Sequence, residues 1–375
     1  MQTKINILTN QGYLSRGFFD LYPLIKWKTP LKENGFKLKF FNYHKNDNIY
    51  KSDIILIHHR YYEQIIKKNF SPNGFEASNL DFMVDFILEA QKKGCKILIF
   101  EGGDSGGTRQ STILKYADLM LKKQVFKDKS LYLRNNVEHR VQIWLPDSVP
   151  ELSKFKAIPP VRKEDLRKIS IGWNIGLCDY RSFPDFVKRF SPLNSFTIPN
   201  WLYSQITYTQ PSKSRPYLFS YRGKNTGHLE RRTHNRRLMM EQIAKNKDKL
   251  NDSFFLGGKI PFKQYANEMR SSKIGLSPFG WGEICFRDFE VMISGSILMK
   301  PDISHLDTFP NYFDEYKTYI PTSWDHEDLI DKLIRVRNNY EDYIAVAKNA
   351  QNIFKKYNED AKLFTKHFSQ IINQL

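Results

Sequence analysis

The sequence predicts an α/β protein of two domains, each built around a parallel β-sheet. Its 375 residues are more than a single hydrophobic core usually serves. In the first half, short apolar runs alternate with amphipathic segments, and the same alternation resumes near residue 217. Between the two halves, residues 147–165 hold several prolines in a polar stretch typical of a linker. We therefore expect one domain over residues 1–160 and a second over residues 161–355.

Four apolar runs in the first half predict the strands of one sheet. They cover residues 4–9, 36–41, 52–57 and 96–100. Residues 80–92 have the period of an amphipathic helix, which Gly94 would end. We also predict a helix over residues 111–123, whose apolar residues would face the core. Strands that alternate with helices in this way imply a parallel sheet.

Polar residues follow several of these strands. They lie in residues 10–17, at His58, and in the glycine-rich loop 101–108, EGGDSGGT. Because ligands gather at the carboxyl ends of parallel strands, we expect these segments to meet at one edge. Asp104 is the first candidate for a general base that deprotonates a hydroxyl, and His58 is the second. An aspartate that only fixes a turn, or a histidine that only satisfies local hydrogen bonds, explains the same residues.

The second half opens with a strand over residues 217–221, YLFSY, which runs directly into Arg222, Gly223 and Lys224. A cation at a strand end beside a glycine is well placed to face a ligand. A helix with four arginines in its first half follows over residues 229–246. Most of these arginines are interpreted as a solvated helix face.

Residues 273–302 have the pattern strand, glycine loop, helix, strand, which is that of a βαβ unit. The loop contains Gly280, Trp281 and Gly282, and Glu283 begins the predicted helix. Free backbone N–H groups and the helix dipole at such a loop favour a phosphate or diphosphate.

Arg287 and Glu290 lie three residues apart in this helix, so their side chains share one face. The arginine can grip a phosphate through two hydrogen bonds, and the glutamate can accept hydrogen bonds from the two hydroxyls of a ribose. The segment could therefore bind both ends of a nucleoside diphosphate. An ordinary βαβ crossover with charged surface residues would show the same local pattern.

The sequence of this segment, GWGEICFRDFEVMISGSILMKPD, resembles the donor-nucleotide segment of GT-B glycosyltransferases, most closely the exostosin-like group. The matching positions are Pro278, Gly280, Gly282, Arg287, Glu290 and Gly295. The more widespread GT-B pattern has a longer spacing between two glutamates than separates Glu283 from Glu290 here. The resemblance covers roughly residues 217–324.

This resemblance implies two Rossmann-like domains that face each other across a cleft, with the donor in the second domain and the acceptor in the first. It also implies that a C-terminal helix, residues 356–375, packs back on the first domain. The implied activity is transfer of a sugar from a nucleoside-diphosphate sugar to a hydroxyl of a glycan or lipid-linked saccharide, as in surface polysaccharide or lipopolysaccharide assembly.

The resemblance also gives roles to the residues of the second domain. Glu290 would hold the ribose, Glu283 would contact the sugar, and Trp281 would lie beside the donor. The departing diphosphate would be stabilised by fixed cations and by the amides of the glycine loop, so that neither a metal nor another cofactor is expected. The expected cations are Arg222, Lys224 and Arg287.

The net charge of +18, from 58 basic and 40 acidic residues, predicts an anionic partner. The charges are spread along the chain without a recognisable nucleic-acid motif, so we interpret them as solvation plus an anionic donor and expect no nucleic acid. Contact with an anionic membrane surface is a secondary hypothesis. A nucleic-acid-binding protein and a non-catalytic nucleotide- or glycan-binding protein are the alternatives.

The cysteines and the hydropathy of the chain indicate the cellular compartment in which we expect the protein. Cys95, Cys178 and Cys285 are odd in number and far apart, which predicts neither a disulfide framework nor a zinc site and favours a reducing compartment. No apolar run approaches the length of a membrane span, and residues 1–10 are interpreted as the start of a strand and not as a signal peptide. We therefore expect a cytoplasmic protein, with the inner face of the plasma membrane as a second location.

Overall fold

The computed structural model describes residues 2–10, 16–69, 80–108, 110–134, 159–180, 205–223, 230–250 and 253–375. Lys224 and most of the predicted linker lie outside these residues. Within them, no helix is both long enough and apolar enough to cross a bilayer.

The first domain is built around a parallel sheet with the strand order β2-β1-β3-β4-β5-β7. Its strands are β1 (Thr3–Leu8), β2 (Phe36–Phe41), β3 (Ile54–His58), β4 (Lys96–Glu101), β5 (Leu119–Lys122) and β7 (Ile169–Ile171). The helices of this domain are α1 (Arg16–Lys26), α2 (Lys28–Glu33), α3 (His59–Asn69), α4 (Asp81–Lys92) and α5 (Ser111–Leu114). All five residues of β3 are buried, as expected of a strand with helices on both faces of its sheet.

The second domain repeats this plan with the parallel order β13-β11-β10-β8-β9. Its strands are β8 (Tyr217–Arg222), β9 (Phe255–Gly257), β10 (Ser272–Leu276), β11 (Ile297–Pro301) and β13 (Ile320–Thr322). Its helices are α6 (Glu230–Lys245), α7 (Lys247–Leu250), α8 (Phe262–Ser271), α9 (Phe286–Ile293), α10 (Leu329–Asn338) and α11 (Tyr340–Glu359). The predicted α/β class with two Rossmann-like domains is therefore confirmed.

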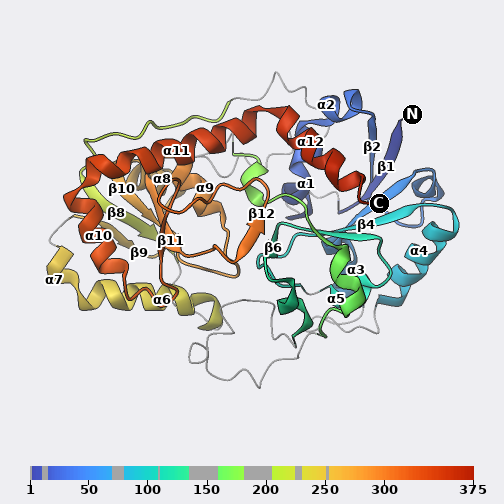
Figure 1. The fold of residues 1–375 in the computed structure, drawn as a ribbon, viewed down its shortest axis with the longest axis horizontal. Helices are drawn as coiled ribbons and strands as arrows, with labels where there is room; N and C mark the ends of the chain where they lie inside the picture. The colour runs from blue at the N-terminus through green and yellow to red at the C-terminus, as the bar shows by residue number, and fades with distance from the viewer. Residues whose placement is uncertain are drawn as a thin grey trace.

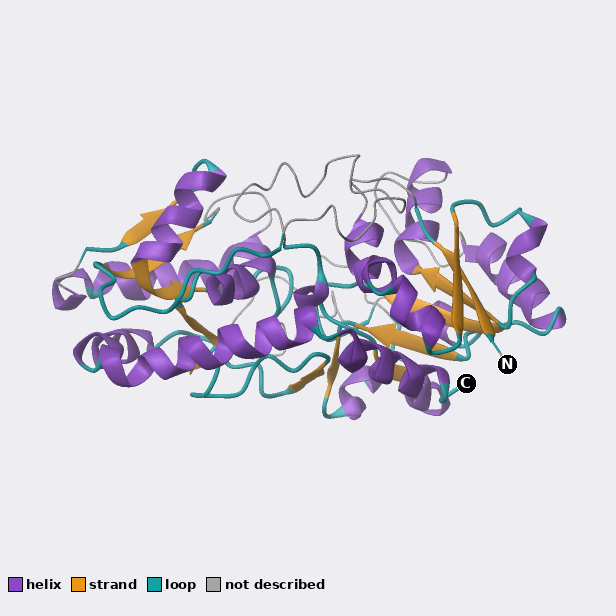
Figure 2. Ribbon diagram, turned by 90° about the horizontal axis from the view of Figure 1, so that it is seen from above, coloured by secondary structure: helices purple, strands orange, loops and turns teal. Residues whose placement is uncertain are grey.

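The two domains are joined by elements that cross between them (Figure 1). An antiparallel ladder pairs β6 (Gln124–Phe126) of the first domain with β12 (Leu306–Thr308) of the second. Helix α11 runs along the second domain, and α12 (Ala361–Ile372) follows it onto the first domain. There Phe364 and Phe368 pack among residues of the first sheet, and the rings of Trp27 and Phe364 lie 4.9 Å apart between centroids. Figure 2 shows the strands gathered in two lobes, with both chain ends in the same lobe.

Two predictions about the middle of the chain are wrong in detail. The first sheet does not end at residue 160, because β7 pairs with β5 and completes its edge. Residues 111–123 do not form one helix: α5 is a single turn, and all four residues of β5 are buried between β4 and β7. Because this apolar segment is buried on both sides, it forms a strand, although the spacing of its apolar residues also suits a helix.

Glycines end two helices as predicted. Gly94 follows α4 with φ of 84°, and Gly295 follows α9 with φ of 67°. Both angles lie in the left-handed region, where a residue without a Cβ atom costs least. Gly295 also has no room for a side chain, because a Cβ atom would lie 2.2 Å from the carbonyl oxygen of Thr209.

Candidate functional site

The order of the second sheet locates a crevice. From β8 the chain goes to β9 on one side and later to β10 on the other, so the strand order reverses between β8 and β10. In open parallel sheets, ligands bind outside the carboxyl ends of the strands at such a reversal. Arg222 is the last residue of β8, and the segment that leads to α9 follows β10.

A cavity of about 420 Å³ lies at this place, within the size range of ligand pockets. It is lined by cationic, aromatic and apolar side chains together with one carboxylate. These residues are Arg222, Arg236, Lys259, Ile260, Phe262, Tyr265, Cys285, Phe286, Arg287 and Glu290. Four cations face one carboxylate, so the wall carries an excess of positive charge suited to an anion. All ten lining residues belong to the second domain.

Arg287 is held in this wall by its surroundings. Its guanidinium donates to the main-chain oxygen of Arg222 and lies over the ring of Tyr221, with 4.7 Å between the guanidinium carbon and the ring centroid. Burial lowers the pKa of Arg287, but Tyr265, Cys285 and Tyr221 together raise it by more, so the net shift is upward. The group is therefore a permanent cation. Its Nε is buried and has no hydrogen-bond partner among the described residues.

Glu290 lies one turn further along α9 and is 5% exposed. Its Oε2 accepts a hydrogen bond from the Tyr265 hydroxyl at 3.0 Å. Burial, and then the charge of Glu290, raise the pKa of Tyr265 well above its usual value, so this hydroxyl remains a donor. The predicted pair of Arg287 and Glu290 thus does line one cavity, from a single helix face.

Arg222 also lines the cavity, but its charge is already paired. Its Nε and Nη2 donate to the two carboxylate oxygens of Glu268 at 2.7 and 2.8 Å, and its Nη1 donates to the main-chain oxygen of Leu256 at 3.2 Å. The side chain of Arg222 is 18% exposed, and that of Glu268 is 7% exposed. A bidentate ion pair of this kind fixes the guanidinium plane and reduces the positive charge that Arg222 offers to a ligand.

Seven of the ten lining residues were not predicted as site residues, and three of these carry a charge or a hydroxyl. Arg236 belongs to the helix face interpreted as solvated, yet its guanidinium lies in the cavity wall close to Gly280. Lys259 follows the glycines after β9, and Tyr265 lies on α8. The position of Lys259 just beyond a strand end was a usable signal. Neither Arg236 nor Tyr265 had one, because their helices approach the site only in the folded chain.

The glycine turn itself lies against the first domain, not in the cavity wall. A Cβ atom on Gly282 would lie 1.4 Å from the main-chain oxygen of Asp104, so the two backbones are in direct contact. The amide of Gly280 donates to the oxygen of Gly282 at 3.3 Å. Gly280, Trp281 and Gly282 are not among the residues that line the cavity, and their contact with the donor stays a prediction. Cys285, which precedes α9, and the first two residues of the helix, Phe286 and Arg287, do line the cavity.

Glu283 contacts the first domain through its carboxylate. It is 1% exposed, and its carboxylate accepts hydrogen bonds from the Ser105 hydroxyl at 2.9 Å and from the Gly106 amide at 3.1 Å. Both partners belong to the first domain. The carboxylate therefore ties the domains together, and it is not among the residues that line the cavity, so its catalytic role stays a prediction.

A buried ion pair supports the start of α9. Lys300 on β11 and Asp288 on α9 are both fully buried, with 2.6 Å between Nζ and Oδ2. The lysine also donates to the main-chain oxygen of Glu283, while Asp288 accepts from the amide of Cys285 at 3.1 Å. This network holds the segment between the domain contact and the cavity in one conformation.

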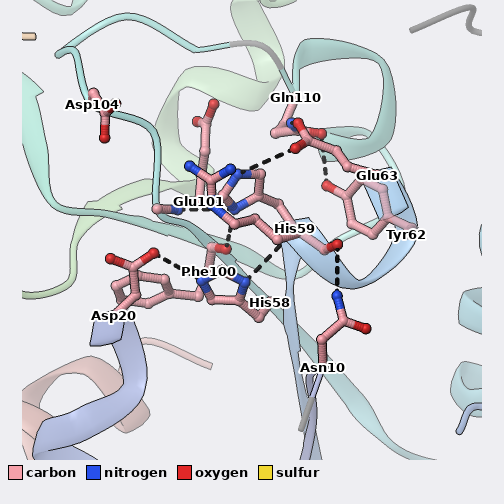
Figure 3. Close-up of polar contacts among 12 residues, drawn as sticks. Asn10, Asp20, His58, His59, Tyr62, Glu63, Phe100, Glu101, Asp104 and Gln110 are labelled. Atoms are coloured by element: carbon pink, nitrogen blue, oxygen red, sulfur yellow. Dashed lines mark hydrogen bonds and ion pairs between the residues drawn. The ribbon is translucent and has the colours of Figure 1, made fainter. Parts of the chain in front are cut away.

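In the first domain, a chain of polar side chains lies at the strand ends (Figure 3). The side chain of Asp104 is 37% exposed, and its carboxylate lies 3.4 Å from Lys123 Nζ. Lys123 Nζ is also 3.6 Å from Asp20, which lies 3.0 Å from Nε2 of His58. Figure 3 shows Asp104 apart from the Asp20–His58 pair. Of these residues, Asp104 is the one with an accessible carboxylate.

His58, the second candidate for a general base, is fully buried, so its role as a base stays a prediction. Burial lowers its pKa below the usual value, although the hydrogen bond and charge of Asp20 act in the opposite direction. A side chain at Gly102 would collide with Asp20, since a Cβ atom there would lie 2.0 Å from Oδ2. The loop 101–108 therefore closes directly over the pair. His58 lies next to Gly102 in the loop that carries Asp104.

Lys224 lies outside the described residues, so its predicted contact with the diphosphate is not placed. Cys95 and Cys178 are buried free thiols, and Cys285 is partly buried beside the cavity. In the part of the chain that the structure describes, no three His, Cys, Asp or Glu side chains gather in a way that could hold a metal ion.

Comparisons with known proteins give similarity in overall structure alone. No protein-family model matches the chain, and no curated protein matches it in sequence. HepE of Anabaena, solved in complex with UDP-glucose, has 10% identity and a TM-score of 0.45, with 100% of both chains covered. TarM has 10% identity, a TM-score of 0.45, and coverage of 100% of this chain and 99% of its own.

A glycosyltransferase from Rickettsia africae has 11% identity, a TM-score of 0.43, and coverage of 99% and 97%. All three TM-scores lie below 0.5. The fold assignment therefore rests on the two parallel sheets, and the site rests on its own contacts.

Proposed function

We propose that the protein is a glycosyltransferase that uses a nucleoside-diphosphate sugar and binds its nucleotide in the cavity of the second domain. The observation that carries the proposal is the composition of the cavity wall. Arg236, Lys259 and Arg287 supply positive charge, Glu290 supplies a buried carboxylate, and Phe262 supplies an apolar surface. These three kinds of group suit the diphosphate, the ribose and the base of one ligand.

In this proposal Arg287 provides most of the electrostatic stabilisation of the departing diphosphate. Negative charge develops on the diphosphate as the bond to the sugar breaks, and a fixed cation beside it lowers the barrier without a metal ion. The N-terminal turn of α9 lines the same wall and adds the positive end of a helix dipole. Arg222 assists less, since Glu268 compensates its charge.

For the acceptor side, we propose that Asp104 takes the proton of the attacking hydroxyl. Its carboxylate is accessible, and its main chain touches Gly282, so its loop lies beside the second domain. The hydroxyl would belong to a glycan or a lipid-linked saccharide. The high positive charge of the chain would favour acceptors at an anionic membrane surface.

Binding of nucleotides to the purified protein tests the donor site. Titration calorimetry with UDP, GDP, ADP, CMP and their sugar conjugates is expected to show one nucleoside diphosphate that binds better than the matching monophosphate. Arg287→Gln is expected to weaken that binding about 10- to 100-fold, because a charge-assisted hydrogen bond is worth about 1.5–3 kcal/mol. Arg167→Gln is the matched control, since Arg167 is an exposed arginine of the first domain.

The outcomes separate the alternatives. Binding of one nucleoside diphosphate that is lost in Arg287→Gln and kept in Arg167→Gln supports the donor site. Equal affinity of both variants for that nucleotide would place its binding site elsewhere. Binding to DNA or RNA alone, with affinity that falls steeply with salt, would favour a nucleic-acid-binding protein and contradict the proposal. Hydrolysis or transfer of the bound sugar distinguishes an enzyme from a protein that only binds nucleotides.

A further inference from the structure

The Tyr265 hydroxyl occupies a position between the two charged groups proposed to bind the nucleotide. It donates to Glu290 Oε2 at 3.0 Å, and it lines the same cavity as the Arg287 guanidinium. Tyr265 comes from α8, whereas Arg287 and Glu290 both come from α9. The phenol therefore holds the carboxylate of an α9 side chain from a second helix.

The burial of these groups makes the arrangement stiff. Tyr265 is 8% exposed and Glu290 is 5% exposed. The ring of Tyr265 lies 5.7 Å from that of Phe262 between centroids, and both rings line the cavity. A carboxylate on a side chain with three rotatable bonds would otherwise sample several orientations, and fixing it in advance removes that cost from ligand binding.

We propose that Tyr265 is a positioning residue that orients Glu290 toward the ribose hydroxyls of the nucleoside diphosphate and so sets the preference for a ribonucleotide. This inference rests on the proposed function of the cavity. It adds that the ribose is recognised through a pair of residues, of which Tyr265 fixes the carboxylate and Glu290 contacts the ligand. Removal of the phenolic oxygen alone then loosens ribose recognition, while the cations that bind the diphosphate remain.

The test compares two ligands that differ only in the ribose hydroxyls. The probes are the nucleoside diphosphate that binds best in the panel above and its 2′,3′-dideoxy form, each titrated into the wild type and into Tyr265→Phe. The wild type is expected to prefer the ribonucleotide by tenfold or more, because loss of hydrogen bonds to a buried carboxylate costs about that much. Tyr265→Phe is expected to reduce this preference at least threefold and to leave affinity for the dideoxy form nearly unchanged.

Two further variants make the result specific. Tyr343→Phe, at a half-buried tyrosine of α11, is the matched control for loss of a phenolic oxygen and is expected to keep the full preference. Glu290→Ala is expected to abolish the preference, and Tyr265→Phe added to it should change nothing further if Tyr265 acts through Glu290. The melting temperature of each variant shows whether it is folded.

The results distinguish this inference from the proposed function. If the wild type binds none of the nucleotides, the proposed function itself fails. If the wild type binds a nucleoside diphosphate but does not prefer the ribose form, the inference is overturned and the donor site stands. An equal loss of affinity for both ligands in Tyr265→Phe would also overturn it, because the tyrosine would then support the pocket in general. Additive effects of Tyr265→Phe and Glu290→Ala on the preference would show that Tyr265 does not act through Glu290.

Discussion

His305 is a single residue whose surroundings have a consequence for stability. Its ring lies between Phe126 of the first domain and Trp324 of the second, with centroid distances of 6.3 and 5.1 Å. Both ring nitrogens are buried without a hydrogen-bond partner among the described residues. Burial lowers the pKa of His305 to about 4, helped by Lys127 and Lys300 and opposed by Asp302.

We predict that His305→Phe makes the folded protein less sensitive to acid. The pKa of the folded state lies below that of the unfolded chain, so the unfolded chain alone gains a proton as the pH falls from about 6.5 toward 4. Above pH ~6.5 the neutral ring therefore makes its full contribution to the free energy of unfolding. About 2 kcal/mol of this contribution is lost between pH ~7 and ~5. Phenylalanine retains the ring contacts and has no proton to gain.

Urea unfolding at a series of pH values measures this effect. The unfolding free energy of the wild type is expected to fall more between pH ~7 and ~5 than that of His305→Phe, by about 2 kcal/mol. Parallel curves for the two proteins would show that His305 is not buried in its neutral form.

Residues with local partners could be predicted from the sequence, and residues with distant partners could not. Arg287 and Glu290 were recognised because three residues of helix place them on one face. Glu283 lies in the same segment, but its partner Ser105 is 178 positions away. Arg222 was correctly placed at a strand end, yet its pairing with Glu268 depends on how α8 packs beside β8. Such contacts carry no local sequence signal.

At the scale of elements, the glycine turn before α9 joins the two domains. Gly282 has no space for a side chain because the main chain of Asp104 lies directly against it. Since backbone atoms cannot move aside as a flexible side chain can, a methyl group there must displace one loop or the other. In the structure, the turn needs glycine because the two domains approach each other closely there. From the sequence, the glycines were instead interpreted as a phosphate-binding loop.

We predict that Gly282→Ala destabilises the protein by about 1–3 kcal/mol, as overpacking of a tight contact does. The free energy of unfolding in urea measures this. Gly258→Ala is the control, because a Cβ atom there would meet nothing within 4 Å. A stability for Gly282→Ala equal to that of the control would mean that the two loops are not in contact in solution.

The elements themselves were predictable where one pattern dominated. The buried strands β3 and β4 and the helices α4 and α9 agree with the apolar runs and amphipathic periods, and Gly94 and Gly295 end their helices. The conformation of segment 111–123 was not predictable. A strand that is buried on both faces is apolar throughout, so the periodicity of its apolar residues does not distinguish it from a buried helix. The ladder of β6 with β12 pairs residues far apart in sequence and could not be foreseen.

At the scale of the whole molecule, the two domains form one connected body around the candidate site. The β6–β12 ladder, the contact of Glu283 with Ser105 and Gly106, and the packing of α12 on the first sheet all cross between them. These contacts bring the loop of Asp104 against the segment that leads into α9. The two-domain plan followed from the sequence, whereas the closeness of the two loops required the structure.

The most direct test of the donor site is a crystal structure of the protein with the nucleoside diphosphate that it binds best. We expect the diphosphate within hydrogen-bond distance of the Arg287 guanidinium and the ribose hydroxyls within that distance of the Glu290 carboxylate. A nucleotide bound outside the cavity, with Arg287 and Glu290 contacting only protein, would contradict the proposed function.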